Sequence, residues 1–203
     1  PTLFAFDDSL ESNSGLQATF TRNSEAIDPS TGKVVPADTP RFETVDGRRG
    51  VLVEEGTTNL VVNPLLEGVY SSGLAPSWAK YGSPSVSENT DVTYIRYGNK
   101  SQKIVATDNA QGVRSLAFTI TSEATYTASC VVYIVSGRVR LDCKVGTGWV
   151  TTMSPEGCTG WWYATVNRTA DSTDGAFLVY SYAGPAEFYV DLAQYDKKPY
   201  ATS

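Results

Sequence analysis

The sequence predicts an all-β protein: an antiparallel β-sandwich preceded by an N-terminal hairpin extension. Its 203 residues include twelve tyrosines and four tryptophans, and glycine, serine and threonine recur throughout, a profile that favours strands and turns over helices. In the second half, apolar and polar residues alternate between turns spaced about ten residues apart, as in a sandwich. No segment has a sustained helical period with caps, so we expect almost no helix.

Residues 1–59 predict hairpins rather than an independent domain. Turn formers cluster at four places: 13–15, 28–32, 37–40 and 46–47. Between them lie segments only long enough for single strands, such as 16–21 and 50–54. These hold too few apolar residues for a core of their own. We therefore expect residues 1–59 to pack on the sandwich formed by residues 60–203, or on a neighbouring subunit.

The strands of the sandwich follow from period-two alternation. In 125–135 the even-numbered residues from Tyr126 to Ile134 share one face. After the turn at Ser136 and Gly137, the run 138–145 has apolar residues at its odd positions and charged residues at its even ones. One polar face and period two indicate half-exposed antiparallel strands. Three further strands are predicted: 161–168, 176–182 and 188–195.

The charge of the chain argues against nucleic acid as a partner. The net charge is −6 and the pI is about 4.7, whereas phosphate backbones are bound by clustered cations. The densest basic group, Arg138, Arg140 and Lys144, alternates along one strand and forms either a solvated face or a ligand-binding one. No run approaches the roughly 20 apolar residues of a membrane span, so we expect no membrane insertion.

Histidine is absent, which excludes Ser-His-Asp, Cys-His and His-ligated metal chemistry. A carboxylate pair for glycoside hydrolysis remains conceivable from four residues: Glu54, Glu55, Glu156 and Asp174. Glu156 and Asp174 lie in turn-like sequence, where exposed acids are ordinary. We therefore expect no enzyme.

The three cysteines, Cys130, Cys143 and Cys158, form no C-x-x-C pair. Their odd number and spacing predict neither a zinc knuckle nor a disulfide scaffold. Buried free thiols are the expectation, and a Cys130 to Cys143 bridge is the alternative.

Two sets of segments resemble known families. The first set, 18–26, 40–42 and 49–60, resembles a recurrent segment of bacteriophage tail and head-fibre proteins that precedes a jelly-roll module. The second set resembles carbohydrate-binding modules of families four and nine. It comprises Asn-Pro-Leu-Leu-Glu-Gly at 63–68, Trp78, 98–103, 126–130, Trp161-Trp162 and 189–194. Leu66 stands where those modules have an aromatic residue, a departure that concerns packing. The resemblance implies that the sandwich is a jelly roll.

The same resemblance implies a structural calcium ion that ties the opening element to the last strand. Glu67 and Asp191 would supply side-chain ligands, and carbonyls near Asn63 and Ser101 would complete the site. Calcium needs only such hard oxygen ligands. The alternative is that Asp191 caps a strand end or faces solvent.

Aromatic side chains are the candidates for stacking on sugar rings. If Trp162 faces the core, Trp161 and Tyr163 face outward about 7 Å apart along the strand, a spacing that suits neighbouring sugars. Further residues expected to flank this pair are Tyr133, Arg138, Arg140 and Trp149. The alternative is that these aromatics pack beneath a loop, beneath the N-terminal hairpins or against another subunit.

Three hypotheses for function follow. The first is a non-catalytic glycan-binding module of a phage structural or adhesion protein, on the virion or outside the cell, whose partner is a polysaccharide or cell-surface glycan. The second is an architectural virion decoration or fibre domain that forms a homo-oligomer, such as a trimer, without binding sugar. The third is an accessory module of a polysaccharide-degrading enzyme.

Overall fold

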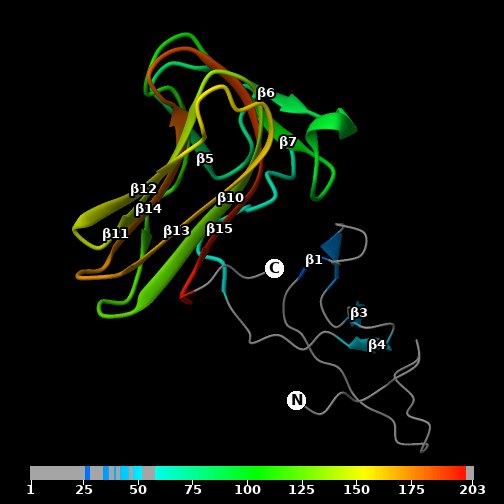
Figure 1. Ribbon diagram of the computed structural model, residues 1–203, viewed down its shortest axis with the longest axis vertical. Coiled ribbons are helices and arrows are strands. Elements are labelled where there is room, and N and C mark those ends of the chain that lie inside the picture. Colours follow the sequence, from blue (N-terminus) through cyan, green and yellow to red (C-terminus); the bar gives the residue numbers. More distant parts are fainter. Residues whose placement is uncertain are drawn as a thin grey trace, which may run out of the picture. The chain divides into compact units, whose positions relative to one another are not determined.

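The computed structural model describes residues 58–199 and, before them, 26–27, 34–36, 39, 42–45 and 48–51 (Figure 1). The chain divides into two compact units, Pro1–Gly56 together with Ser203, and Thr57–Thr202. None of the helices formed by the described residues has the length and apolarity needed to cross a membrane.

The first unit contains two short antiparallel hairpins. They pair β1 (Ala26–Ile27) with β2 (Val34–Val35), and β3 (Phe42–Val45) with β4 (Arg48–Val51). The predicted turn clusters at 28–32 and 46–47 fall between the paired strands. The predicted segment 16–21 lies outside the described residues, as does the part 52–54 of the predicted segment 50–54, whose residues 50–51 belong to β4. Packing of this unit on the sandwich or on another subunit stays a prediction.

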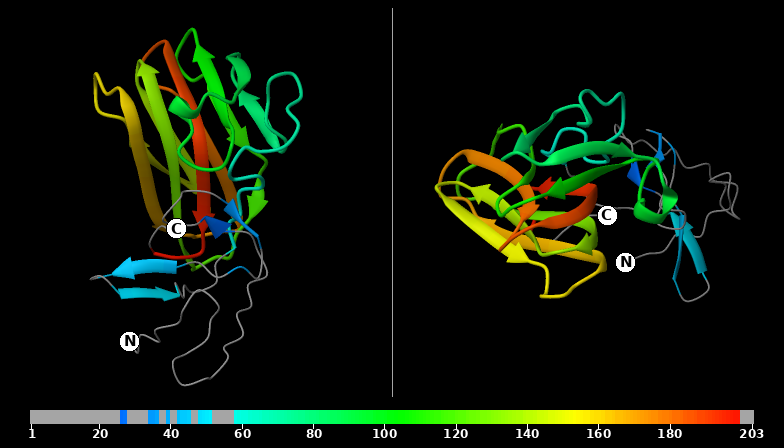
Figure 2. Two further views of the ribbon diagram at one scale, coloured as in Figure 1. Left: turned by 90° about the vertical axis from the view of Figure 1, so that its right-hand side faces the viewer. Right: turned by 90° about the horizontal axis from the view of Figure 1, so that it is seen from above.

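The second unit is a sandwich of two antiparallel sheets (Figure 2). The five-stranded sheet runs in the order β13 (Gly160–Thr169), β10 (Thr125–Ser136), β15 (Ala186–Asp196), β7 (Ser101–Ala106) and β6 (Ser85–Asn89). The six-stranded sheet runs in the order β12 (Gly148–Met153), β11 (Val139–Val145), β14 (Asp174–Ser181), β8 (Gly112–Ser115) and β5 (Trp78–Tyr81), with β9 (Phe118–Thr119) beside β14. Within residues 58–199 the helical content is one 3-10 turn, η1 (Val92–Tyr94). The predicted all-β sandwich is confirmed.

The chain passes repeatedly from one sheet to the other. β10 and β11 are separated only by Gly137 and Arg138, yet β10 belongs to the five-stranded sheet and β11 to the six-stranded one. The chain changes sheets again between β14 and β15. The two sheets therefore face each other across a core to which both members of each consecutive pair contribute.

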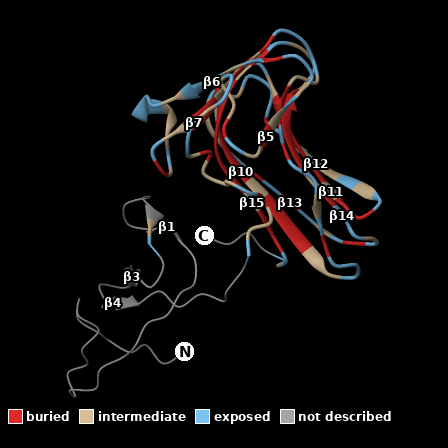
Figure 3. Cartoon of the chain, turned by 180° about the vertical axis from the view of Figure 1, so that it is seen from behind, coloured by how far each residue is buried: buried red, intermediate tan, exposed pale blue. Residues whose placement is uncertain are grey.

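Alternate residues of the long strands fill this core (Figure 3). In β10 the even-numbered residues from Tyr126 to Ile134 are buried, and in β11 the odd-numbered ones from Val139 to Val145, as the alternation predicts. Phe177 of β14 is fully buried between the sheets. Burial of each such side chain contributes about 1.5–3 kcal/mol.

The cysteines are free: Cys130 and Cys143 are buried and Cys158 is half-buried. Burial raises the pKa of both buried thiols, which keeps them protonated. Because β10 and β11 lie in different sheets, a bridge between these two residues would join the sheets rather than neighbouring strands of one sheet.

The start of the second unit is hydrogen-bonded to its last strand. The Asn59 side chain donates to the Ala193 carbonyl at 2.9 Å and accepts from the Tyr195 amide at 3.0 Å. The Leu60 amide donates to the Tyr195 carbonyl at 3.0 Å. The first residues of the sandwich therefore lie next to the end of its last strand.

Candidate functional site

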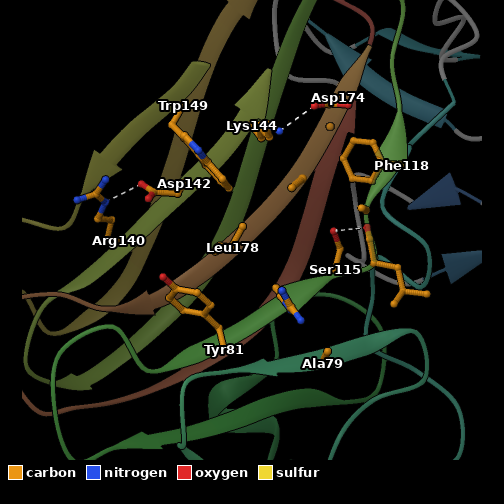
Figure 4. A pocket seen from close by; sticks show the side chains of 15 residues that line it. Ala79, Tyr81, Ser115, Phe118, Arg140, Asp142, Lys144, Trp149, Asp174 and Leu178 are labelled. Carbon is orange, nitrogen blue, oxygen red and sulfur yellow. Dashed lines mark hydrogen bonds and ion pairs between the residues drawn. The ribbon is translucent and has the colours of Figure 1, made fainter. Parts of the chain in front are cut away.

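An open cleft of about 880 Å³ lies on the outer face of the six-stranded sheet. β5, β8, β11, β12 and β14 supply its floor, and the segment 115–118 supplies one wall (Figure 4). Because side chains alternate along a strand, every second residue of these strands faces the cleft while its neighbours fill the core.

The pairing of the strands arranges the floor in rows. One row across the sheet is Met153, Arg140, Tyr180, Gly112 and Tyr81. The next is Thr151, Asp142, Leu178, Arg114 and Ala79. A third begins with Trp149, Lys144 and Ala176. Each row brings together residues far apart in the sequence.

A buried carboxylate organises the first two rows. Asp142 is 7% exposed, and its Oδ1 accepts from Arg140 Nε at 2.6 Å and from Thr151 Oγ1 at 2.7 Å. Its Oδ2 accepts from the Tyr180 hydroxyl at 2.5 Å. Burial, and then this hydrogen bond, raise the pKa of Tyr180, so its hydroxyl stays a donor. The Asp142 network fixes the orientation of three side chains, of which Arg140 lines the cleft.

Two tyrosine rings form a platform beside that network. Tyr81 and Tyr180 have ring centroids 5.1 Å apart at an interplanar angle of 55°. Arg140 lies over the Tyr180 ring, its guanidinium carbon 5.6 Å from the centroid. Tyr180 is buried, so the ring that offers apolar surface to the cleft, next to polar groups of fixed direction, is that of half-buried Tyr81.

The other side of the cleft is marked by Trp149, whose side chain is 48% exposed. It lies opposite Lys144, which donates to Asp174 Oδ2 at 2.8 Å (Figure 4). Phe118 lies on the far side of Lys144 and Asp174 from Trp149 (Figure 4) and packs edge-on against Tyr195 at 4.7 Å between centroids. Aromatic surface is therefore present on both sides of a polar floor.

Three aromatic residues of the predicted sugar site, Tyr133, Trp161 and Tyr163, belong to strands of the other sheet. In β13 the register is the predicted one: Ala164 and Val166 are buried, Trp162 packs on the core, and Tyr163 is 53% exposed. Trp161 contacts Tyr133 edge to face at 5.2 Å between centroids.

A loop covers part of this face. Tyr94 of η1 stacks on Tyr189 with centroids 4.1 Å apart and meets Tyr133 at 5.0 Å. Tyr133 therefore packs beneath a loop, which was the alternative expectation for it. Tyr163 stays exposed.

Arg140 and Trp149 do not lie on the sheet that carries Trp161 and Tyr163, whereas a position of Arg138 beside that pair stays a prediction. Arg140 and Trp149 line the cleft of the six-stranded sheet, whereas β13 belongs to the five-stranded sheet. Arg138 donates to the Ser154 carbonyl at 3.3 and 3.2 Å and lies 5.3 Å from the Tyr182 centroid. Alternation separates inward from outward residues, but it does not say to which sheet a strand belongs.

The residues predicted to hold calcium meet around one loop. Asp191, 0% exposed, accepts from the Arg96 and Tyr97 amides at 2.6 and 2.8 Å. Glu67 Oε1 accepts from the amide of Asn99. Both carboxylates thus hold the segment 96–99, and the alternative that Asp191 faces solvent is wrong.

Asn63 and Ser101 support this region. The Asn63 side chain donates to the Glu67 carbonyl and accepts from the Glu67 amide, each at 2.9 Å, and the buried Ser101 hydroxyl accepts from Asn89 at 2.9 Å. Burial and the carboxylates of Glu88, Glu67 and Asp191 raise the pKa of Tyr70, a sign of concentrated negative charge. Lys100 supplies one cation through its 2.7 Å ion pair with Glu88.

The donor set fits calcium in chemistry, since carboxylate and carbonyl oxygens are its preferred ligands. Among residues 58–199 and the described positions before them, no three His, Cys, Asp or Glu side chains form a cluster that could hold a metal. A calcium ion here would therefore depend on Glu67, Asp191 and backbone carbonyls.

The sandwich is similar to solved carbohydrate-binding modules. The CBM22-1 xylan-binding domain of Xyn10C from Paenibacillus barcinonensis matches with a TM-score of 0.50 and 13% identity, over 73% of this chain and 100% of its own. TmCBM61, solved in complex with β-1,4-galactotriose, matches with a TM-score of 0.50 and 14% identity, over 70% of this chain and 99% of its own. A family 16 carbohydrate-binding module matches with a TM-score of 0.50 and 22% identity, over 68% and 99%.

No protein-family model and no curated protein matches the sequence. At these identities the likeness defines the fold: the second unit is a jelly-roll β-sandwich of the carbohydrate-binding-module type. The resemblance to families four and nine in particular, and to phage proteins, stays a prediction.

Sequence analysis missed Tyr81, Asp142 and Arg114 as cleft residues, and Tyr180 as the buried ring that packs against Tyr81. A signal for part of this set was present: the charged face of 138–145 precedes a strand that carries Tyr180 and Tyr182. Pairing those two strands in register places Arg140 beside Tyr180.

Proposed function

We propose that this chain is a non-catalytic glycan-binding module that holds a polysaccharide in the cleft of the six-stranded sheet. One observation carries the proposal: exposed Trp149 and half-buried Tyr81, whose ring packs against buried Tyr180, flank a floor of oriented charged and hydroxyl groups. Sugar rings stack on aromatic faces, and their hydroxyls need donors and acceptors of fixed direction. The modules of similar fold that are named for xylan binding, or were solved with β-1,4-galactotriose, support the same class.

Binding without cleavage is supported by the ion pairs that both cleft carboxylates make. Asp142 is ion-paired with Arg140 and Asp174 with Lys144, whereas glycoside hydrolysis needs one carboxyl group that carries a proton. Of the other acids considered, Glu156 is exposed in a turn away from the cleft lining, and Glu54 and Glu55 lie outside the described residues.

The module belongs, in this proposal, to a phage structural or adhesion protein on the virion or outside the cell. The resemblance of 18–26, 40–42 and 49–60 to phage tail and head-fibre segments supports this context. An accessory module of a polysaccharide-degrading enzyme is the alternative. A structural calcium ion bound by Glu67 and Asp191 is part of the proposal, supported by the convergence of both carboxylates on 96–99.

A second candidate is the architectural virion domain, in which the outer face of the five-stranded sheet contacts another subunit. Exposed Tyr163 beside Trp161 favours it, because large exposed aromatics are common in interfaces. Sedimentation equilibrium of the full chain and of Tyr163→Ser tests it. A trimer that dissociates in the variant supports this role, and a monomer at all concentrations overturns it.

Glycan-array binding of the full chain, followed by titration calorimetry on the hits, tests the main proposal. Trp149→Ala should abolish binding, and Trp161→Ala should leave it unchanged, although both residues carry the same side chain on opposite sheets. Loss of binding in Trp161→Ala with retention in Trp149→Ala would move the site to the five-stranded sheet. Absence of binding to every glycan would overturn the proposed function.

A further inference from the structure

The charges of the cleft are unevenly matched. Three cations and two carboxylates line it: Arg114, Arg140, Lys144, Asp142 and Asp174. Arg140 pairs with Asp142 at 2.6 Å and Lys144 with Asp174 at 2.8 Å. Within the part of the chain that the structure describes, Arg114 makes no ion pair or side-chain hydrogen bond, and its side chain is exposed.

Arg114 lies on the floor rather than at the rim. It is on β8, between Leu178 of β14 and Ala79 of β5 in the second row. Both neighbours are apolar and shorter than arginine, so the guanidinium projects above them into the cleft. A cation held there in a chain of net charge −6 is not part of a general basic surface.

Asp142 cannot neutralise this guanidinium. It lies in the same row, but Leu178 stands between them, which places the two strands roughly 10 Å apart. Both Asp142 oxygens are already engaged by Arg140, Thr151 and Tyr180. The Arg114 guanidinium is therefore available to pair with an anionic group of a ligand in the cleft.

We propose that the glycan of this cleft is acidic, and that a uronate carboxylate of the polysaccharide pairs with Arg114 while neighbouring rings stack on the aromatic residues. This inference rests on the proposed function and specifies its ligand class. A guanidinium presents two parallel N–H donors that match a planar carboxylate. The Tyr81–Tyr180 platform begins one row away from Arg114, so a carboxylate and a stacked ring can belong to one oligosaccharide.

The test compares one polymer in two charge states. The wild-type chain is titrated at low and high salt with polygalacturonate and with its fully methyl-esterified form. Neutral β-1,4-galactan is titrated as a third, uncharged polymer. We expect polygalacturonate to bind about tenfold more tightly than the ester at low salt, since a hydrogen-bonded ion pair is worth that ratio or more. Added salt should reduce this difference.

Variants assign the preference to one side chain. Arg114→Gln should abolish the difference between acid and ester, and Arg114→Lys should restore only part of it, because an ammonium lacks the two-pronged geometry. Arg96→Gln is the matched control, since it removes another exposed arginine that does not line the cleft; it should keep the preference. Thermal melting checks that all variants fold.

The failure of this inference differs from the failure of the proposed function. Equal binding of acid and ester, or a preference that survives in Arg114→Gln, overturns the acidic ligand. Preference for dextran sulfate over polygalacturonate overturns the carboxylate. If these glycans bind and Trp149→Ala lowers all affinities while Arg114→Gln changes none, the cleft remains the glycan site and only its acidic specificity is overturned.

Discussion

Gly112 separates Tyr81 from Tyr180 in one row of the six-stranded sheet, and the two rings meet across it. A Cβ at position 112 would lie 2.1 Å from the Val179 carbonyl oxygen and 2.5 Å from the Tyr180 Cα. Both of these atoms belong to the backbone, so the strand itself would have to move. The absence of a side chain on Gly112 is therefore what allows the tyrosine platform to form.

Gly112→Ala should destabilise the fold and weaken glycan binding together. The clash with β14 should cost about 1–3 kcal/mol, the usual range for overpacking, and the shift of Tyr180 should disturb its bond to Asp142. Urea unfolding measures the first effect and calorimetry the second. Tyr81→Leu is the companion variant, because it removes one ring without crowding; it should lose affinity with little loss of stability. Normal stability in Gly112→Ala would show that β8 and β14 are not paired in this register.

Trp162→Ala should cost more stability than Trp161→Ala. Trp162 packs on the core beside Ala164 and Val166, so its removal should cost about 2–4 kcal/mol, at or below the range for a fully buried tryptophan. Trp161 lies on the outer face against Tyr133 and contributes less. Chemical denaturation of both variants decides the register of β13. A larger loss of stability in Trp161→Ala would show that Trp161, and not Trp162, faces the core.

Stability should fall as the pH rises above about 10, the ordinary pKa of tyrosine. The pKa of Tyr180 is raised in the folded state by burial and by Asp142, so the unfolded chain loses this proton first. The folded state then binds more protons, and the free energy of unfolding decreases with pH in that range. Tyr180→Phe should make the decrease shallower in melting curves between pH 9 and 11. An identical slope in wild type and variant would contradict this account.

Calcium added to chelator-treated protein should raise the melting temperature, because an ion that binds only the folded state stabilises it by mass action. Glu67→Gln and Asp191→Asn should abolish the rise while they keep an acceptor for the amides of 96–99. Glu123→Gln, an exposed acid elsewhere, is the control. A melting temperature that does not respond to calcium would leave the two carboxylates with a purely structural role.

The strands that sequence analysis located are those whose signal is local. β10, β11, β13, β14 and β15 follow predicted runs within a few residues, because period-two alternation over seven or more residues has one interpretation. β6 (Ser85–Asn89) was missed, because its five residues contain a single apolar side chain, Val86.

The cleft could not be predicted from the sequence, for a different reason. Arg140 and Trp149 were selected as binding residues, but the face they share is created by pairing β11 with β12 and β14. Arg114 and Leu178 become neighbours across 64 residues of sequence, and no local pattern encodes that register. Alternation therefore predicted which side chains point away from the core. Which of them lie side by side depends on the sheet to which each strand belongs.

The hydrogen bonds of Asn59 and Leu60 to the end of β15 hold the segment that enters the sandwich next to the strand that leaves it. A unit whose incoming and outgoing chain segments adjoin can be spliced into a surface loop of a larger polypeptide without forcing the host's flanking segments apart. It can be repeated, lost or exchanged between genes while the proteins that carry it keep their own architecture.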